Sequence, residues 1–193
     1  MPPKQKITEE NLLFHAFQIA KEQGIDAVTS RSVAKAVGCS IQPVFSHFPT
    51  MEELRQATFR YASNKLMQDI LQYQNEPDFM ARTNYWFLNL ARNERNLFEL
   101  LYLSDSYSNT NLWDVMMEWE SNKKMVSAMA DKYKISEKEC KDIFLRGFFL
   151  LYGIATMIAT NRMDISSEEA FDMMTRTTQE MVKGLNKEKG TIE

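Results

Sequence analysis

The sequence predicts an all-α fold, and three observations support that prediction. Apolar residues recur at helical spacing through most of the chain, and no stretch alternates between apolar and polar residues as a β-strand does. Only 6 glycines and 5 prolines interrupt the 193 residues, which is few for the many tight turns of a β-sandwich or β-barrel. Hydrophobic residues make up 44% of the chain, so it has enough apolar side chains for a buried core.

Three short helices are predicted near the N-terminus. Thr8 stands where an N-cap would precede a helix over residues 9–23, which carries Glu residues in its first turn. Thr29 offers the N-cap of a second helix, and Gly38 ends that helix after about two turns. Ser40 is expected to cap a third short helix.

Longer helices are predicted in the rest of the chain. Thr50, Ser136 and Ser166 each precede a Glu by three residues, which is the capping-box pattern that begins a helix. Residues 104–111 are polar and are predicted to form a loop. The predicted helices run from Thr50 to before Pro77, over about 78–92, 96–103 and 112–132, and onward from Ser136 and Ser166.

The charge is unevenly distributed along the chain. The whole sequence has 23 basic and 26 acidic residues, a formal net charge of -3, which argues against a protein that binds any polyanion. Residues 1–65, however, hold 8 basic and 6 acidic residues, whereas the remainder holds 15 and 20. The acidic excess therefore belongs to the C-terminal two-thirds, and the N-terminal third is mildly basic.

Several classes of protein are disfavoured by what the sequence lacks. Cys39 and Cys140 are far apart and form no CxxC pair, which predicts neither a disulfide framework nor a zinc site and favours a reduced, cytoplasmic location. With His15 and His47 as the only histidines, we expect no metal site. The chain has no phosphate-binding glycine loop, HExxH pattern or Ser-His-Asp order, so we expect no catalytic residues, no cofactor and no enzyme activity.

We also expect no targeting segment and no membrane span. Residues 1–6 lack the apolar core of a signal peptide. The most apolar stretch, residues 147–160, is shorter than the roughly 20 residues that cross a bilayer, so a buried helix is the prediction there.

The second and third helices have the layout of a helix-turn-helix, in which the second helix of the pair enters the major groove of DNA. Gly38 suits the left-handed turn between them. Gln42 has the side chain that pairs bidentately with adenine, and Ile41 or Pro43 would contact a thymine methyl group. The candidate DNA-binding residues of this turn and helix are Ser40, Ile41, Gln42 and Pro43, with Thr29, Ser30 and Arg31 expected to meet a phosphate at the N-terminus of the second helix.

The string from Thr29 to Ser40, followed by Val44 to Phe48 and Met51 to Leu54, resembles the N-terminal domain of the TetR/AcrR family of transcriptional regulators. The resemblance covers about residues 7–60. Phe45 and His47 are further candidate DNA-binding residues, and for His47 a phosphate contact and a packing role both stay open. Two positions depart from the family pattern, because Phe45 stands where Tyr is usual and Met51 where Lys is common. Each departure removes a group that contacts phosphate, and the candidate replacements are Lys4, Lys6, His47 and Arg55.

The resemblance implies an all-helical homodimer in two domains. Residues 1–48 are expected to form a three-helix helix-turn-helix domain that binds double-stranded DNA. Residues 49–193 are expected to form a larger helical domain that binds a small-molecule effector and dimerises through its last two helices. The implied function is a ligand-responsive repressor, bound to a palindromic operator and released by a small apolar or amphipathic ligand. Two alternatives stay open: a coactivator whose N-terminal domain contacts a protein instead of DNA, and a helical-bundle enzyme.

Aromatic and methionine side chains are dense between residues 85 and 129, as in a pocket for an apolar ligand. Plain core packing is the alternative for each of them. The candidate pocket residues are Trp86, Phe98, Tyr102, Trp113, Met117 and Met125.

The helix over about residues 144–159 is apolar nearly all round, so it should be covered on two sides. The protomer's own core and a dimer partner would provide that cover. The candidate dimer residues, with an apolar stripe of the last helix included, are Phe148, Leu151, Ala155, Phe171, Met174, Thr178 and Met181.

Overall fold

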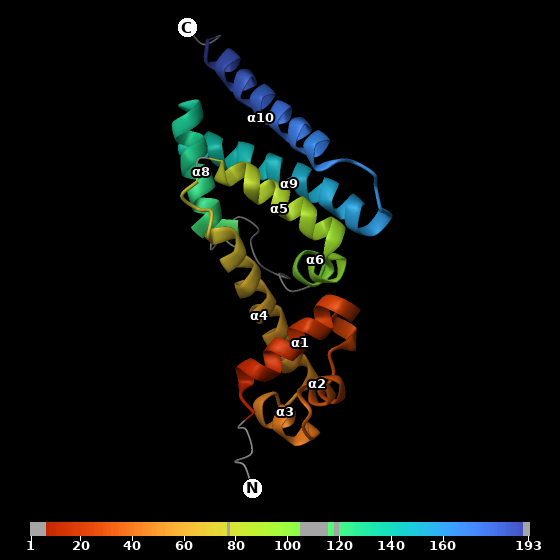
Figure 1. The fold of residues 1–193 in the computed structure, drawn as a ribbon. Coiled ribbons are helices and arrows are strands. Elements are labelled where there is room, and N and C mark those ends of the chain that lie inside the picture. Colours follow the sequence, from red (N-terminus) through yellow and green to blue (C-terminus); the bar gives the residue numbers. More distant parts are fainter. Residues whose placement is uncertain (1–6, 77, 105–115, 118–119, 191–193) are drawn as a thin grey trace. The chain divides into compact units, whose positions relative to one another are not determined.

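The computed structural model describes residues 7–76, 78–104, 116–117 and 120–190 (Figure 1). Over those residues all regular secondary structure is helical, so the predicted all-α fold is confirmed. The chain packs as two compact units. The first unit comprises Met1–Asp69 and Glu94–Ser106, and the second comprises Ile70–Asn93 and Tyr107–Glu193. The functional division after residue 48 stays a prediction, since these units describe packing alone.

The first unit contains the three N-terminal helices and two further ones (Figure 1). α1 packs against α2 and α6, and α2 packs against α3. The helices are α1 (Glu9–Gln23), the short 3₁₀ helix η1 (Ile25–Ala27), α2 (Ser30–Val37), α3 (Ile41–His47), α4 (Met51–Leu71, whose last two residues belong to the second unit) and α6 (Arg95–Tyr102).

The predicted caps of α1 and α2 are confirmed. The Thr8 hydroxyl accepts a hydrogen bond from the Asn11 N–H at 3.2 Å. The Thr29 hydroxyl accepts from the Ser32 N–H at 3.0 Å, and the Ser32 hydroxyl accepts from the Thr29 N–H at 2.9 Å. Each bond satisfies a first-turn donor that has no intrahelical partner, which is why both helices begin where the sequence predicts.

The turn between α2 and α3 depends on Gly38. This residue has φ 77° and ψ 34°, the left-handed conformation that glycine adopts without steric cost. The Cys39 N–H then donates to the Ala34 carbonyl at 2.9 Å and closes the end of α2. One sequence prediction is corrected here, because the side chain of Ser40 makes no capping hydrogen bond at the start of α3.

Apolar side chains from α1, α2, α3 and α4 form the core of the first unit. Its fully buried members include Leu12, Val33, Val44 and Leu54. α6 joins this unit through polar contacts to α1: the Asn96 amide donates to the Lys21 carbonyl at 2.9 Å, and Lys21 pairs with Glu94 at 2.8 Å. A segment far along the chain therefore belongs to the N-terminal unit.

The second unit is built around α9 (Figure 1). α9 packs against α5, α8 and α10, and α5 also packs against α10. Both predicted capping boxes are confirmed, since the Ser136 and Ser166 hydroxyls accept from the N–H groups of Glu139 and Glu169 at 3.3 Å and 3.1 Å. The helices are α5 (Phe79–Asn93), α8 (Glu120–Tyr133), α9 (Glu137–Asn161) and α10 (Ser167–Gly190).

The helix predicted over about 112–132 is observed as a helical Met116–Met117 and as α8, and the rest of it lies outside the described residues. Most of the predicted loop over 104–111 also lies outside the described residues.

Cys140 lies in an apolar cluster with Val126 and Ile143. Burial raises the pKa of its thiol, so the thiol stays protonated and packs as a small apolar side chain.

Within the described residues, α9 is the one helix whose length and composition would suffice to cross a membrane, with a mean hydropathy of 1.7 over its most apolar window. A core helix of a soluble protein meets the same criteria, so this observation is weak evidence for a span.

The left-handed turn leads to a stability prediction. We expect Gly38→Ala to lower the free energy of unfolding by about 1 kcal/mol, because an L-residue is strained at this φ. No atom lies within 4 Å of the added Cβ, so the loss would be a pure backbone effect. Urea unfolding followed by circular dichroism measures it. The matched control is Gly184→Ala within α10, where alanine should stabilise by about 0.5–1 kcal/mol. The same change at both positions would contradict the prediction.

Candidate nucleic-acid interface

α3 has one buried side and one exposed side. Val44 is fully buried and Phe48, just after the helix, is 4% exposed, so these two side chains hold α3 against the core of the first unit. On the other side Gln42 is exposed, and Ile41 and Phe45 are 46% and 44% exposed. Large apolar side chains left in water on a short helix are typical of a surface that meets a partner.

The remaining α3 candidates lie at the edges of this surface. Pro43 is half-buried and occupies the first turn, where a missing N–H costs no intrahelical bond. Ser40 and His47 are exposed. Ser46 is exposed as well, and sequence analysis did not single it out. A helix of 7 residues is too short for the spacing of its apolar residues to show which side is exposed.

The N-terminus of α2 uses two of its three predicted phosphate contacts internally. The Thr29 side chain belongs to the capping box with Ser32, and Ser30 is only 6% exposed. The Ser30 hydroxyl donates to the sulfur of Met51 at 3.3 Å. Arg31 is exposed. An anion at this helix end would therefore meet Arg31 and first-turn backbone N–H groups more readily than the hydroxyls.

Met51, which stands where the family pattern commonly has Lys, thus makes a contact within the protein, with the Ser30 hydroxyl. Its sulfur links the first residue of α4 to the first residue of α2. The unusual Met51 is visible in the sequence but its contact with Ser30 is not, because a hydroxyl–thioether pair 21 positions apart leaves no pattern in the sequence.

The two candidate replacement cations that the structure describes, His47 and Arg55, each lie near a carboxylate. The His47 Nδ1 is 4.0 Å from a Glu9 carboxylate oxygen, and Arg55 is 3.4 Å from Asp26. Lys4 and Lys6 lie outside the described residues.

Two cations on α2 form a better-placed basic pair. Arg31 and Lys35 are both exposed, four residues apart on one side of the helix, and make no ion pair within the described part of the first unit. Lys35 is a candidate that sequence analysis missed, although its spacing from Arg31 was a usable signal.

A cavity of about 250 Å³ lies in the second unit, and among the predicted pocket residues Trp86 lines it. Met125 packs behind it with Ile70 and Phe79, and Met117 packs against a neighbouring apolar cluster. Phe98 and Tyr102 belong to the first unit, where their ring centroids are 5.4 Å apart, and Trp113 lies outside the described residues. Of the described candidates, Trp86 is thus the one that lines this cavity.

The candidate dimer residues fall into two groups. Leu151, Ala155 and Met174 are at most 8% exposed, so the protomer itself covers them. The other four are partly exposed: Phe148, Phe171, Thr178 and Met181. The largest exposed apolar side chains of α9 and α10 are instead Phe149, Met157 and Met173, at 56%, 44% and 44%. These three residues could not be singled out from the sequence, because a helix that is apolar all round does not reveal which side the protomer covers.

The comparisons with known proteins agree with this architecture. Residues 12–58 match the family model described as bacterial regulatory proteins of the tetR family. A TetR-like transcriptional regulator from Rhodococcus sp. RHA1 has a TM-score of 0.62 at 14% identity, over 94% of this chain and 98% of its own. The multidrug binding protein EbrR, complexed with ethidium, has a TM-score of 0.59 at 18% identity, over 92% of this chain and 99% of its own. No curated protein matches the chain significantly.

The two sides of α3 lead to a paired prediction. We expect Gln42→Ala to cost about 1–3 kcal/mol in discrimination between a specific site and random DNA, because it removes a base-reading amide. Its effect on the free energy of unfolding should stay below about 0.5 kcal/mol, since the side chain is exposed. The control Val44→Ala should lower that free energy by roughly 2 kcal/mol through loss of buried volume. DNA titration and urea unfolding measure the two quantities, and equal loss of affinity for specific and random DNA would contradict base readout by Gln42.

Proposed function

We propose that this chain, whose residues 12–58 match the model of the tetR family of bacterial regulatory proteins, is a ligand-responsive transcriptional repressor. In the proposal it binds a palindromic DNA element as a homodimer and is released by a small apolar or amphipathic ligand. Proteins of this family are transcriptional regulators rather than enzymes. The resemblance noted in the sequence is thereby confirmed, and the repressor role, the operator, the dimer and the ligand are the parts proposed here.

The observation that carries the proposal is the exposed side of α3. Ile41 and Gln42 stand at its N-terminal end, the part of a recognition helix that reaches base edges. The Arg31 and Lys35 pair on α2 supplies positive charge for the phosphate backbone. An amide that reads adenine next to an apolar side chain that contacts thymine methyls favours half-sites that contain A·T pairs.

A second candidate function has one specific observation in its favour. The exposed Phe45 cannot donate to a phosphate, and Met51 is held by Ser30. A surface with Ile41 and Phe45 exposed and few phosphate donors would also suit a protein partner. In that case the chain would act as a coactivator through its first unit. Specific DNA binding decides between the two.

The proposed dimer uses the exposed side of α9. Only 33% of the apolar window of this helix is buried inside the protomer. Phe149, Gly153 and Met157 follow each other at intervals of four residues and so lie on one side of the helix. No atom lies within 4 Å of a Cβ built at Gly153, which leaves room for a close helix approach. Met173 on α10 adds to the exposed apolar area. Burial of this area gives the partner its driving force.

Release by a ligand is the remaining step of the proposal. The cavity in the second unit supports it, as does the ethidium complex of EbrR, a protein of similar fold. A ligand that binds one conformer more tightly shifts the population toward it. In a bound dimer the two recognition helices are about 34–36 Å apart, one turn of DNA, so a conformer with another spacing loses one half-site.

We further propose a cytoplasmic location, in keeping with the free thiols of Cys39 and Cys140.

The DNA-binding proposal is tested by a salt titration against the DNA upstream of the protein's own gene, with random DNA as control. We expect specific binding at low salt. It should be weaker and less salt-dependent than in a protein that has Tyr at position 45 and Lys at position 51, because each of those side chains contacts a phosphate. Met51→Lys and Phe45→Tyr should each strengthen binding. Met51→Lys should steepen the slope of log K against log salt by about 0.9, because it adds one phosphate contact.

The control for added charge is Asn186→Lys, which places the same cation on an exposed site of α10 and should leave the slope unchanged. If wild type binds both DNAs equally at low salt, the repressor proposal fails and the protein-contact function takes its place.

The dimer proposal predicts that Phe149→Arg, alone or with Met157→Lys, produces a monomer at micromolar concentration. Each charge would have to be buried against an apolar partner surface, which is costly without a counter-ion. Light scattering after size-exclusion chromatography measures the mass. The control Phe14→Arg changes a 43% exposed phenylalanine of α1 and should leave the dimer intact. A double variant that stays dimeric would place the interface elsewhere.

A further inference from the structure

Among the described residues, aromatic rings and one charged side chain line the cavity in the second unit. Its volume is about 250 Å³, which suits a small molecule. Of the six described residues that line it, three are aromatic and one, an arginine, is charged. The lining residues are Ile70, Tyr73, Arg82, Thr83, Tyr85 and Trp86.

The aromatic walls are held in place by contacts behind them. Trp86 packs against a buried cluster that contains Phe79 and Met125. The Tyr85 ring stacks on the Phe171 ring of α10, with centroids 5.1 Å apart and an interplanar angle of 21°. Walls that are already ordered lose little conformational entropy when a ligand binds.

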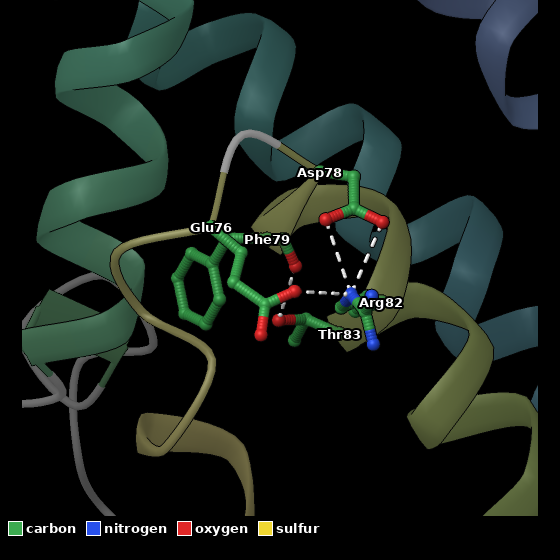
Figure 2. A network of polar contacts seen from close by, with 5 residues as sticks. All are labelled: Glu76, Asp78, Phe79, Arg82 and Thr83. Carbon is green, nitrogen blue, oxygen red and sulfur yellow. Dashed lines mark hydrogen bonds and ion pairs between the residues drawn. The ribbon is translucent and has the colours of Figure 1, made fainter.

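The guanidinium of Arg82 is oriented by two carboxylates (Figure 2). Its Nε lies 2.9 Å from a Glu76 oxygen and 3.1 Å from each oxygen of Asp78. Its central carbon lies 5.2 Å from the centroid of the Tyr73 ring. The hydrogen bond and the charge of Asp78, helped by the charge of Glu76, raise the pKa of Arg82 above its usual value. The guanidinium is therefore charged at neutral pH.

The two terminal nitrogens of Arg82 remain for a ligand. Every carboxylate contact described runs through Nε, and neither terminal nitrogen has a hydrogen-bond partner among the described residues. The Thr83 hydroxyl donates to the Phe79 carbonyl at 2.9 Å, so its hydrogen is already used (Figure 2). The terminal N–H groups of Arg82 are thus donors that no other described residue uses. Two guanidinium nitrogens in one plane match the two oxygens of a carboxylate.

We propose that the effector of this protein is a small amphipathic carboxylate, with its charged group on the terminal nitrogens of Arg82 and its apolar part between Tyr85 and Trp86. This inference rests on the proposed function, since it names the ligand class of a ligand-responsive regulator. Glu76 and Asp78 would by themselves favour a cationic ligand. They are not among the described lining residues, and both contact Nε, so the Arg82 guanidinium is the one charged group among the described residues that line the cavity.

The test compares three probes of one shape by isothermal titration calorimetry on the full chain without DNA. The probes are 2-naphthoate, 2-naphthamide and 2-naphthylmethylammonium. We expect the carboxylate to bind at least about tenfold more tightly than the other two, because charge-assisted bidentate bonds are roughly twice as strong as neutral ones. Arg82→Gln should abolish that preference.

The matched control is Arg95→Gln. Arg95 pairs with Glu99 at 2.9 Å through Nε and is 48% exposed, against 46% for Arg82, but it belongs to the first unit. It should leave the preference intact. Equal binding of all three probes, tighter binding of the ammonium probe, or a preference that survives Arg82→Gln would overturn the inference. The wild-type comparison of probes decides the matter even if Arg82→Gln disturbs folding.

The two proposals fail separately. Carboxylate-selective binding without any specific DNA binding would refute the repressor while leaving the ligand assignment in place. Specific DNA binding by a protein with no carboxylate preference would refute the ligand assignment alone. When both hold, 2-naphthoate added to the protein–DNA complex should reduce the bound fraction in wild type and not in Arg82→Gln.

Discussion

The first unit depends on burying one side of α3. A helix of 7 residues is not stable by itself in water, so it exists only where side chains attach it to a core. Val44 and Phe48 provide that attachment, and the left-handed turn at Gly38 brings α3 back toward α2 at the required angle. Everything that the exposed side of α3 presents to a partner follows from this anchoring. The recognition surface and the core are two sides of the same short helix.

Polar side chains in the first unit are used mostly within it. Ser30 donates to Met51, and Arg55 lies against Asp26. Such contacts fix the junctions between α2, α4 and the 3₁₀ segment, but they remove groups that would otherwise meet a phosphate. Arg31 and Lys35 differ because they are exposed and make no ion pair in the described part of that unit. A basic pair on one helix side concentrates positive charge locally, even in a chain whose net charge is -3.

Arg82 illustrates how one side chain can be both held and available. Carboxylates on one edge of the guanidinium fix its orientation, while the terminal nitrogens stay unbonded among the described residues. A group that is ordered before the ligand arrives loses less entropy on binding than a mobile one. The same argument applies to Tyr85, which is stacked on Phe171 before any ligand enters the cavity.

The sequence by itself determined the helices and the resemblance of residues 12–58 to the tetR family. Caps such as Thr29 with Ser32 and Ser136 with Glu139 act within four residues, so helix starts can be predicted from local pattern. The tertiary structure alone decided which side of each helix is covered. Ala155 and Phe149 both lie on the apolar α9, yet one is fully buried and the other 56% exposed. That difference arises from packing between segments far apart in the chain, as do the Ser30–Met51 contact and the return of α6 to the first unit. Local patterns cannot encode such contacts, because each depends on the positions of several other helices at once.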